Sequence, residues 1–263
     1  MSTLIRLAVA LLLALFAAGS QSGPQQQLLG QSGESPTDPN WSSVKLLLHM
    51  DGANGSSTWT DSSGRHTVTA QGTPAGPLLS TTDPIFAGTA SGGAIGDTDE
   101  YLNLTTNLTD FAFGTGDFTV EWRMYGNSPS ADTTVFSSQP NTAPGAYGVA
   151  IRALADNGFI VYENVGTGVV YWYPTTVANT WNHVAVVRAS GVYALYYNGV
   201  AATPTAIGTQ NRNYTYSSFV AIGRFYSNTG VGDLNIRSDE LRVSNIARYT
   251  ANFTPRRSAF PDS

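Results

Sequence analysis

The sequence predicts an all-β sandwich of two packed antiparallel sheets, and three observations support this prediction. From residue 44 onward, short apolar runs alternate with clusters of Gly, Pro, Asn and Asp, a pattern typical of strands joined by turns. No apolar repeat with a helical period follows residue 20, so long amphipathic helices are not expected. Charged residues make up only 12% of the chain while Thr, Ser, Asn and Gly are abundant, so hydroxyls and amides rather than ions must solvate the outer faces.

The predicted strands are about a dozen short runs that are apolar or alternate in polarity. Asn198-Gly199 follows one of them and is typical of a type I′ turn, because both residues tolerate a positive φ. Residues 192–197 and 200–203 are therefore expected to form a β-hairpin. The runs are Val44–Met50, His66–Ala70, Tyr101–Leu104, Phe118–Tyr125, Thr133–Ser137, Tyr147–Arg152, Phe159–Tyr162, Val169–Tyr173, His183–Arg188, Val192–Tyr197, Phe219–Phe225 and Leu234–Val243.

The N-terminal part of the chain differs from the rest. In residues 1–20 a single Arg precedes an apolar run that ends in small residues, which is the layout of a secretory signal peptide. The run is shorter than the ~20 residues that span a bilayer, and a retained hydrophobic helix that anchors the protein is the open alternative. Residues 21–43 are rich in Gln, Gly, Ser and Pro and predict a flexible linker. One β domain at 44–257 and a short tail at 258–263 complete the expected organisation.

Charge and cysteine content exclude two classes of partner or site. The formal net charge of −5 removes the electrostatic basis for binding nucleic acid, which depends on Lys and Arg neutralising phosphates. The chain has no Cys, so it forms neither disulfides nor a Cys-ligated zinc site. Its stability must come from packing and from oxygen- or nitrogen-based interactions.

Seven segments, met in order between Val44 and Pro255, resemble a known family. That family is the laminin-G-like branch of the concanavalin A-like lectin/glucanase superfamily, in the form found in bacterial surface proteins and tailed-phage structural proteins. The resemblance implies a jelly-roll sandwich, but this fold carries lectins, adhesion modules, virion decorations and hydrolases alike. The segments are Val44–Gly52, Asp61–Gly64, Glu100–Leu104, Gly114–Trp122, Thr180–Arg188, Tyr196–Gly199 and Asp239–Val243, with Ala247–Pro255 closing the match.

The carboxylates argue against an enzyme. Glycosidases need two carboxyls about 5 to 9.5 Å apart, and the Glu-x-Asp-x-x-Glu run of the family's glucanases is absent. Asp117 and Glu121 share a strand face but lie ~13 Å apart along it. Asp239 and Glu240 are adjacent, so a regular strand points them to opposite faces. The sequence therefore predicts a protein that is not an enzyme.

Three residues are predicted to be structural. Trp181 and His183 lie in the segment Thr180–Arg188, where the resemblance implies a central strand. Trp181 is therefore expected in the core, and His183 is expected to be packed and hydrogen-bonded rather than catalytic. Trp122 is similarly placed and is also expected in the core.

Asp51 and Asp239 are the candidate metal ligands. Asp51 ends the first predicted strand and Asp239 lies on a late one, and the resemblance implies that the two chain ends occupy neighbouring strands. Members of this fold often hold a structural Ca²⁺ with such carboxylates, since Ca²⁺ takes 6–8 oxygen ligands. The alternative is that both are ordinary turn-capping carboxylates. No other cofactor is expected.

Tyr171, Trp172 and Tyr173 are the candidate ligand-binding residues. In a regular strand Trp172 points to one face and both tyrosines to the other, so at least one set of large rings faces away from the core. The apolar faces of sugars stack on such rings. The equally open alternative is that the outward rings pack under a loop or against another subunit.

Two non-enzymatic functions are consistent with these features. The first is a recognition or adhesion module that binds a glycan or another surface polymer. The second is a structural appendage or decoration protein of a virion or cell surface, in contact with copies of itself or with other surface proteins. A polysaccharide hydrolase is the least favoured function. Each places the protein outside the cell, on the cell surface or on the virion exterior, with membrane contact only through an uncleaved N-terminal segment.

Overall fold

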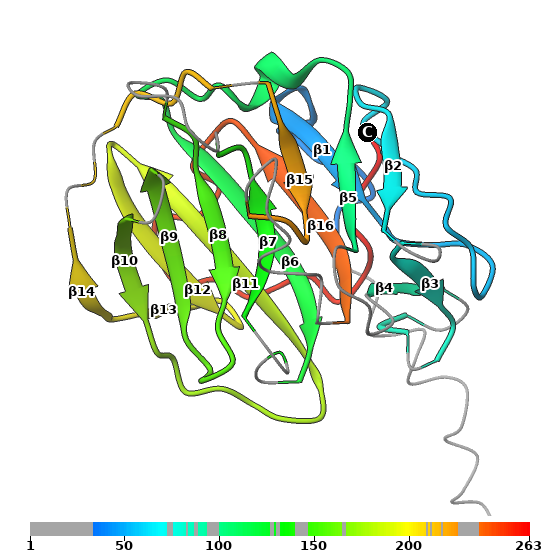
Figure 1. Ribbon diagram of the computed structural model, residues 1–263. Coiled ribbons are helices and arrows are strands. Elements are labelled where there is room, and N and C mark those ends of the chain that lie inside the picture. The colour runs from blue at the N-terminus through cyan, green and yellow to red at the C-terminus, as the bar shows by residue number, and fades with distance from the viewer. Residues whose placement is uncertain are drawn as a thin grey trace, which may run out of the picture. The chain divides into compact units, whose positions relative to one another are not determined.

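The described strands form two antiparallel sheets that pack face to face, with sheet B in front of sheet A in Figure 1. A computed structural model describes residues 34–72, 76–82, 84–86, 89–93, 100–126, 129, 132–139, 147–164, 167–208, 210, 212–216, 218–225 and 237–263. The predicted signal peptide or anchor lies outside these residues. None of the described helices is both long and apolar enough to cross a membrane.

Sheet A follows the order β13–β12–β11–β6–β16–β4–β3, and β1 also pairs with β16. The first and last strands of the domain are therefore neighbours, as the resemblance implied. Two short 3₁₀ helices, Trp41–Ser43 and Leu108–Phe111, lie outside the sheets. The strands of sheet A are β1 (Val44–Leu48), β3 (Leu78–Ser80), β4 (Ser91–Gly93), β6 (Phe118–Tyr125), β11 (Trp181–Ala189), β12 (Val192–Tyr197), β13 (Val200–Ala202) and β16 (Ser238–Ser244).

Sheet B follows the order β14–β10–β9–β8–β7–β15–β5–β2. At one end of the sandwich its edge strand β14 directly follows β13, the edge strand of sheet A, so the chain crosses between the sheets there. The strands of sheet B are β2 (Val68–Gln71), β5 (Tyr101–Leu104), β7 (Thr133–Ser137), β8 (Ala150–Ala153), β9 (Phe159–Asn164), β10 (Thr167–Trp172), β14 (Pro204–Ile207) and β15 (Val220–Ile222).

The core lies between the two inner faces, and strand β6 shows why. Its alternate residues Val120, Trp122 and Met124 belong to the main apolar cluster, as expected from the two-residue period of a strand. Trp122 is fully buried and its ring lies 6.1 Å from the ring of Phe159 in sheet B. The prediction that Trp122 is a core residue is confirmed.

The β12–β13 hairpin is also confirmed. Asn198 has a φ of 50° and Gly199 a φ of 79°, the positive values that a type I′ turn requires. Gly199 is needed for a second reason, because a Cβ there would lie 1.9 Å from the carbonyl oxygen of Phe253. The turn thus packs tightly against the C-terminal segment, residues 245–263.

The C-terminal segment covers part of the outer face of sheet A. Tyr249 and Phe253 stack with ring centroids 3.6 Å apart and pack on Ala185, Val187 and Tyr196, which point outward from β11 and β12. This second apolar cluster removes that part of the face from solvent. Phe260 forms a further cluster with buried residues of β1.

The structure differs from the sequence predictions at both ends of the domain. Residues 37–43 were assigned to the linker, yet the compact unit begins at Thr37, and the Asp38 carboxylate is buried among arginines. The predicted tail at 258–263 is docked, since Phe260 is buried and the Asp38 amide donates to the carbonyl of Ser263. Parts of segments 37–43 and 258–263 therefore pack against the β domain predicted at 44–257.

Trp181 is a further correction. It begins β11, is only half-buried, and packs edge to face on Tyr125 with ring centroids 5.7 Å apart. It lies outside the main core because strand alternation places it on the same outward face of β11 as Ala185 and Val187, whereas Val184 and Val186 point inward. The central-strand assignment itself holds, since β11 pairs with β6 and β12.

We expect Trp122→Ala to lower the free energy of unfolding by about 3–5 kcal/mol, the range for truncating a fully buried aromatic side chain. Trp181→Ala serves as the matched control and should cost clearly less, because its ring is only partly removed from water. Urea denaturation followed by circular dichroism measures both. Equal losses in the two variants would contradict the placement of the core.

Candidate functional site

The outer face of sheet B presents tyrosines. Register pairs Trp172 with Phe159 and Tyr171 with Ile160. Phe159 lies in the main apolar cluster, so Trp172 points into the core, where its exposed fraction is 0%, while Tyr171 points outward and is half-buried. Tyr173 follows the strand and is 47% exposed. Trp172 is therefore withdrawn as a candidate ligand contact, because a fully buried ring has no surface to offer.

Tyr162 on the adjacent strand extends this aromatic face. It pairs with Ala150 in the register of β8 and β9, and its ring packs edge to face on Phe225 at 4.8 Å. Burial, and then the neighbouring phenol of Tyr162, raises the pKa of Tyr171. Sequence spacing does not connect Tyr162 with Tyr171, because only the pairing of β9 with β10 brings the two side chains together.

The ring of Tyr173 is held in place by the turn between β8 and β9. Its hydroxyl donates to Asp156 Oδ2 at 3.2 Å, and the Gly158 amide donates to Asp156 Oδ1 at 3.2 Å. The turn closes through a hydrogen bond from the Leu154 amide to the Gly158 carbonyl at 2.8 Å. A Cβ at Gly158 would lie 2.7 Å from Tyr173 Cε1, so the ring lies directly against this glycine.

A groove of about 520 Å³ opens beside Tyr173 at the edge where the two sheets meet. Its volume falls in the range of small-molecule sites, about 300–1,000 Å³. It is formed by the segment after β10 and by the β12–β13 hairpin, and none of the described residues that line it is charged. They are Tyr173, Pro174, Thr175, Tyr197, Asn198, Val200, Ala201, Ala202 and Thr203.

Polar groups lie in the same cross-strand row as Tyr171. Register places Thr134 opposite Arg152, and Arg152 opposite Ile160. Arg152 pairs with Asp132 at 3.4 Å, yet its Nε and the Thr134 Oγ1 are buried without a hydrogen-bond partner. Thr134 is 0% and Arg152 only 8% exposed, so this row is packed beside the aromatic face and offers no open polar group to a ligand.

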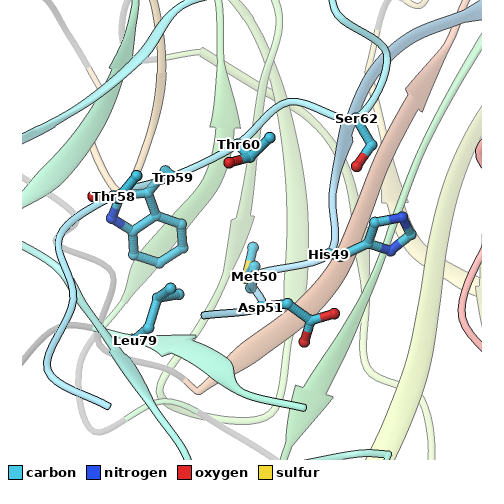
Figure 2. Close-up of a pocket in the computed structure, with 8 residues that line it drawn as sticks. All are labelled: His49, Met50, Asp51, Thr58, Trp59, Thr60, Ser62 and Leu79. Carbon is cyan, nitrogen blue, oxygen red and sulfur yellow. The ribbon is translucent and has the colours of Figure 1, made fainter. Parts of the chain in front are cut away.

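A second pocket, of about 240 Å³, lies at the end of β1. Figure 2 shows His49 and Asp51 on the segment that follows β1, with Trp59 and Leu79 lining the pocket from other segments. His49 bonds Glu240 through Nδ1 and Asp262 through Nε2, both at 2.7 Å. Burial alone lowers the pKa of His49, but these two carboxylates outweigh it and raise the pKa to about 9.

The surroundings of Asp239 are compatible with the predicted cation. Its Oδ2 is buried without a hydrogen-bond partner. Burial, then the Glu240 carboxylate, and then Asp51 raise the pKa of Asp239 to about 8. A cation held by Asp51 and Asp239 would relieve this repulsion. The described residues contain no cluster of three or more His, Cys, Asp or Glu side chains suited to a metal, so backbone carbonyls or water must supply most of the 6–8 oxygens.

Glu121, considered above as half of a catalytic pair, has a structural role. It is fully buried on the outer side of β6, where Oε1 accepts from Arg242 Nε at 2.9 Å and Oε2 accepts from Tyr249 at 2.8 Å. Burial alone would raise its pKa, but Arg242, His183 and Arg248 hold the pKa well below its usual range. An ionised carboxylate already bonded on both oxygens is poorly placed to act as an acid or nucleophile.

His183 is part of the same network, as predicted. Its Nε2 lies 3.0 Å from Glu121 Oε2, and the side chain is buried. The pKa of His183 is lowered, mainly because burial disfavours the charged form of the imidazole. The imidazole is therefore neutral and donates its Nε2 hydrogen to the carboxylate.

Two antiparallel sheets in this order, with the first and last strands paired, define the class of lectin-like jelly-roll sandwiches. The family model described as "Concanavalin A-like lectin/glucanases superfamily", a laminin-G-type model, matches residues 96–252, more than half of the chain. The protein belongs to this superfamily. Among curated protein sequences no match is found.

Solved structures share the fold at low sequence identity. The binding domain of botulinum neurotoxin serotype D aligns with a TM-score of 0.56 and 12% identity over 82% of this chain and 50% of that one. The binding domain of Paraclostridial Mosquitocidal Protein 1 gives 0.56 and 14% over 80% and 50%. A Trypanosoma rangeli sialidase in complex with 2,3-difluorosialic acid gives 0.50 and 13% over 79% and 31%. This chain therefore spans about half or less of the chains it resembles.

Replacing Glu121 by Gln should lower the free energy of unfolding at pH 7 by about 3–5 kcal/mol, because the buried Arg242 keeps only Asp38 as a carboxylate partner and Tyr249 loses its ionised acceptor. The native pKa of Glu121 is depressed, so the stability it contributes is present above pH 4.5 and is lost as the pH falls. The difference between wild type and variant should therefore shrink at pH 3. Urea titrations at both pH values measure it, with Asp117→Asn as a more exposed control. An unchanged difference at pH 3 would contradict an ionised Glu121.

Calcium binding at Asp51 and Asp239 predicts a higher melting temperature with millimolar Ca²⁺ than with chelator. At a free concentration about 100 times the Kd the stabilisation is about 2.7 kcal/mol. Asp239→Asn should abolish the calcium effect, since it removes a carboxylate that a bound cation would hold in its ionised form. Identical wild-type melting curves with Ca²⁺ and with chelator would exclude both residues as metal ligands.

Proposed function

We propose that this protein is a non-catalytic recognition module that binds a glycan, or a surface polymer presenting one, through the outer face of sheet B. The observation that carries the proposal is the outward set of Tyr162, Tyr171 and Tyr173, in which the half-exposed ring of Tyr173 is already fixed. Sugar C–H faces stack on such rings while hydroxyls bond nearby polar groups.

The two outer faces differ in a way that supports this choice. The C-terminal segment packs on the outer face of sheet A, and the charged side chains there neutralise one another. On sheet B, by contrast, Tyr162 and Tyr171 are only half-buried and Tyr173 is exposed at the end of β10. Rings that stay partly open to solvent offer a sugar a stacking surface, which a closed apolar cluster does not.

The comparisons are consistent with recognition. The superfamily's description includes lectins, and several similar structures are described as toxin binding domains, one of them as a receptor binding domain. Because one similar structure belongs to a sialidase, hydrolysis is measured in the same experiment. The two carboxylates near Tyr173 already have partners. Asp156 accepts hydrogen bonds from the Tyr173 hydroxyl and the Gly158 amide. Asp132 accepts from the Ala155 amide and pairs with Arg152.

The proposal includes an extracellular location, at a cell surface or on a virion exterior. The hydroxyl- and amide-rich surface and the N-terminal apolar run support it. In this setting the module displays its tyrosine face to a neighbouring surface. The structural appendage function remains the second candidate, and the binding experiment distinguishes the two.

Tyr171→Ala and Tyr173→Ala should each weaken glycan binding by about 1–3 kcal/mol, roughly 5- to 150-fold, while the melting temperature stays near that of wild type. The full chain is applied to an array of neutral and acidic glycans, and released sugar is assayed in parallel. Val192→Ala, which truncates an exposed apolar residue elsewhere, is the control and should bind normally.

Absence of binding to every glycan, together with loss of self-association in the two tyrosine variants, would assign those residues to a subunit interface. That outcome replaces recognition with the structural function. Release of sugar by the wild-type protein would instead overturn the non-catalytic part of the proposal.

A further inference from the structure

We infer that the groove beside Tyr173 is a subsite for an uncharged pyranose unit, and that Asp156 and Gly158 are positioning residues that hold the Tyr173 ring as its stacking wall. The inference rests on the proposed glycan-binding function and specifies its location and ligand class. It concerns one edge of the sandwich, where the segment after β10 faces the β12–β13 hairpin.

The first argument is the way Tyr173 is fixed. An exposed tyrosine normally samples several rotamers and loses that freedom when a ligand binds. Here the hydroxyl is bonded to Asp156 and the ring edge lies against Gly158. The ring is therefore preorganised, although 47% of its surface stays open to solvent. A ring that is fixed in this way and still open on one side can stack on a ligand at little cost in side-chain entropy.

The second argument is the composition of the groove. Pro174, Val200 and the two alanines of β13 offer an apolar floor and rim, while the exposed side chains of Thr175 and Thr203 offer hydroxyls that both donate and accept. The Asn198 amide is already bonded to Asn182 and to the His183 backbone, so it shapes the groove rather than binding a ligand. One ring, an apolar surface and a few hydroxyls match the two-sided chemistry of a sugar.

The third argument is charge, which separates neutral from acidic sugars. Among the described residues, no charged side chain lines the groove. Burial, and then the carboxylates of Asp156 and Asp132, raise the pKa of Tyr173, which shows that the ring's hydroxyl end lies in a negative field. The nearby cation, Arg152, is buried and paired with Asp132. A carboxylate- or sulfate-bearing sugar would be repelled there without a free counter-charge.

The experiment uses the full chain and calorimetric titration with neutral oligosaccharides, and with uronate and sulfated oligosaccharides of the same length. Wild type should bind a neutral oligosaccharide, and Tyr173→Ala should weaken it about 5- to 150-fold. Gly158→Ala should also weaken it, because the added methyl displaces the ring, while the phenol itself is retained. Asp156→Asn should have a smaller effect, since an amide oxygen can still accept the tyrosine hydrogen bond.

A double-mutant cycle tests whether Gly158 acts through the ring. In a Tyr173→Ala background, Gly158→Ala should cause no further loss of affinity, because the displaced ring is absent. Full additivity of the two losses would overturn the positioning role. Melting temperatures of all variants establish that the fold is retained.

Two further outcomes distinguish this inference from the function on which it rests. If the protein binds acidic but not neutral glycans, the groove is not the proposed subsite, although glycan recognition still holds. The same conclusion follows if binding survives Tyr173→Ala but is lost in Tyr171→Ala. Failure of the folded wild-type chain to bind any oligosaccharide overturns both. Binding of a neutral oligosaccharide, with non-additive losses of affinity for the substitutions at residues 158 and 173, supports both the glycan-binding function and the groove as its subsite.

Discussion

The buried carboxylate of Glu121 is the constraint on which much of the structure depends. A charge without solvent must be paired, and Glu121 is paired with Arg242 from the last strand and bonded by Tyr249 from the C-terminal segment. Asp38 then bridges Arg242 and Arg248, which draws the start of the domain into the same network. One buried charge on β6 thereby ties together segments from both ends of the domain, and these segments close over sheet A.

This closure removes part of the outer face of sheet A from solvent. Apolar residues that point outward from β11 and β12 are covered by Tyr249 and Phe253. That region of sheet A therefore stabilises the fold and is closed to solvent. Residues that point outward from the middle of sheet B, such as Thr134, Arg152 and Ile160, are buried as well. The strand period that places Trp172 inside leaves Tyr171 half-buried on the outer face and Tyr173 exposed at the end of β10, so the open aromatic surface lies toward this edge of sheet B.

The sequence predicted those features that depend on local pattern. The bounds of β5, β6, β7 and β12 and the positive φ of Asn198 follow from apolar alternation and from turn chemistry. β3 and β4 were missed because their three residues each carry little strand propensity, and pairing with β16 and with each other forms them. The docked tail was missed for the same reason, since Phe260 and Asp38 gain their partners only after the ends of the domain meet.

The candidate site shows where local pattern stops being informative. Strand alternation predicts that Trp172 and the two tyrosines point to opposite faces. Which of the two faces is buried depends on how the sheets pack, and the sequence of this strand does not show it. Asp156 and Gly158 lie on a different hairpin, and nothing in their spacing connects them with Tyr173. A single stacked ring above a groove of about 520 Å³ provides modest affinity, and sites of this kind gain strength when several copies bind one surface. Glycan recognition and display on a cell or virion surface are therefore compatible functions, because multivalent display would make a weak site effective.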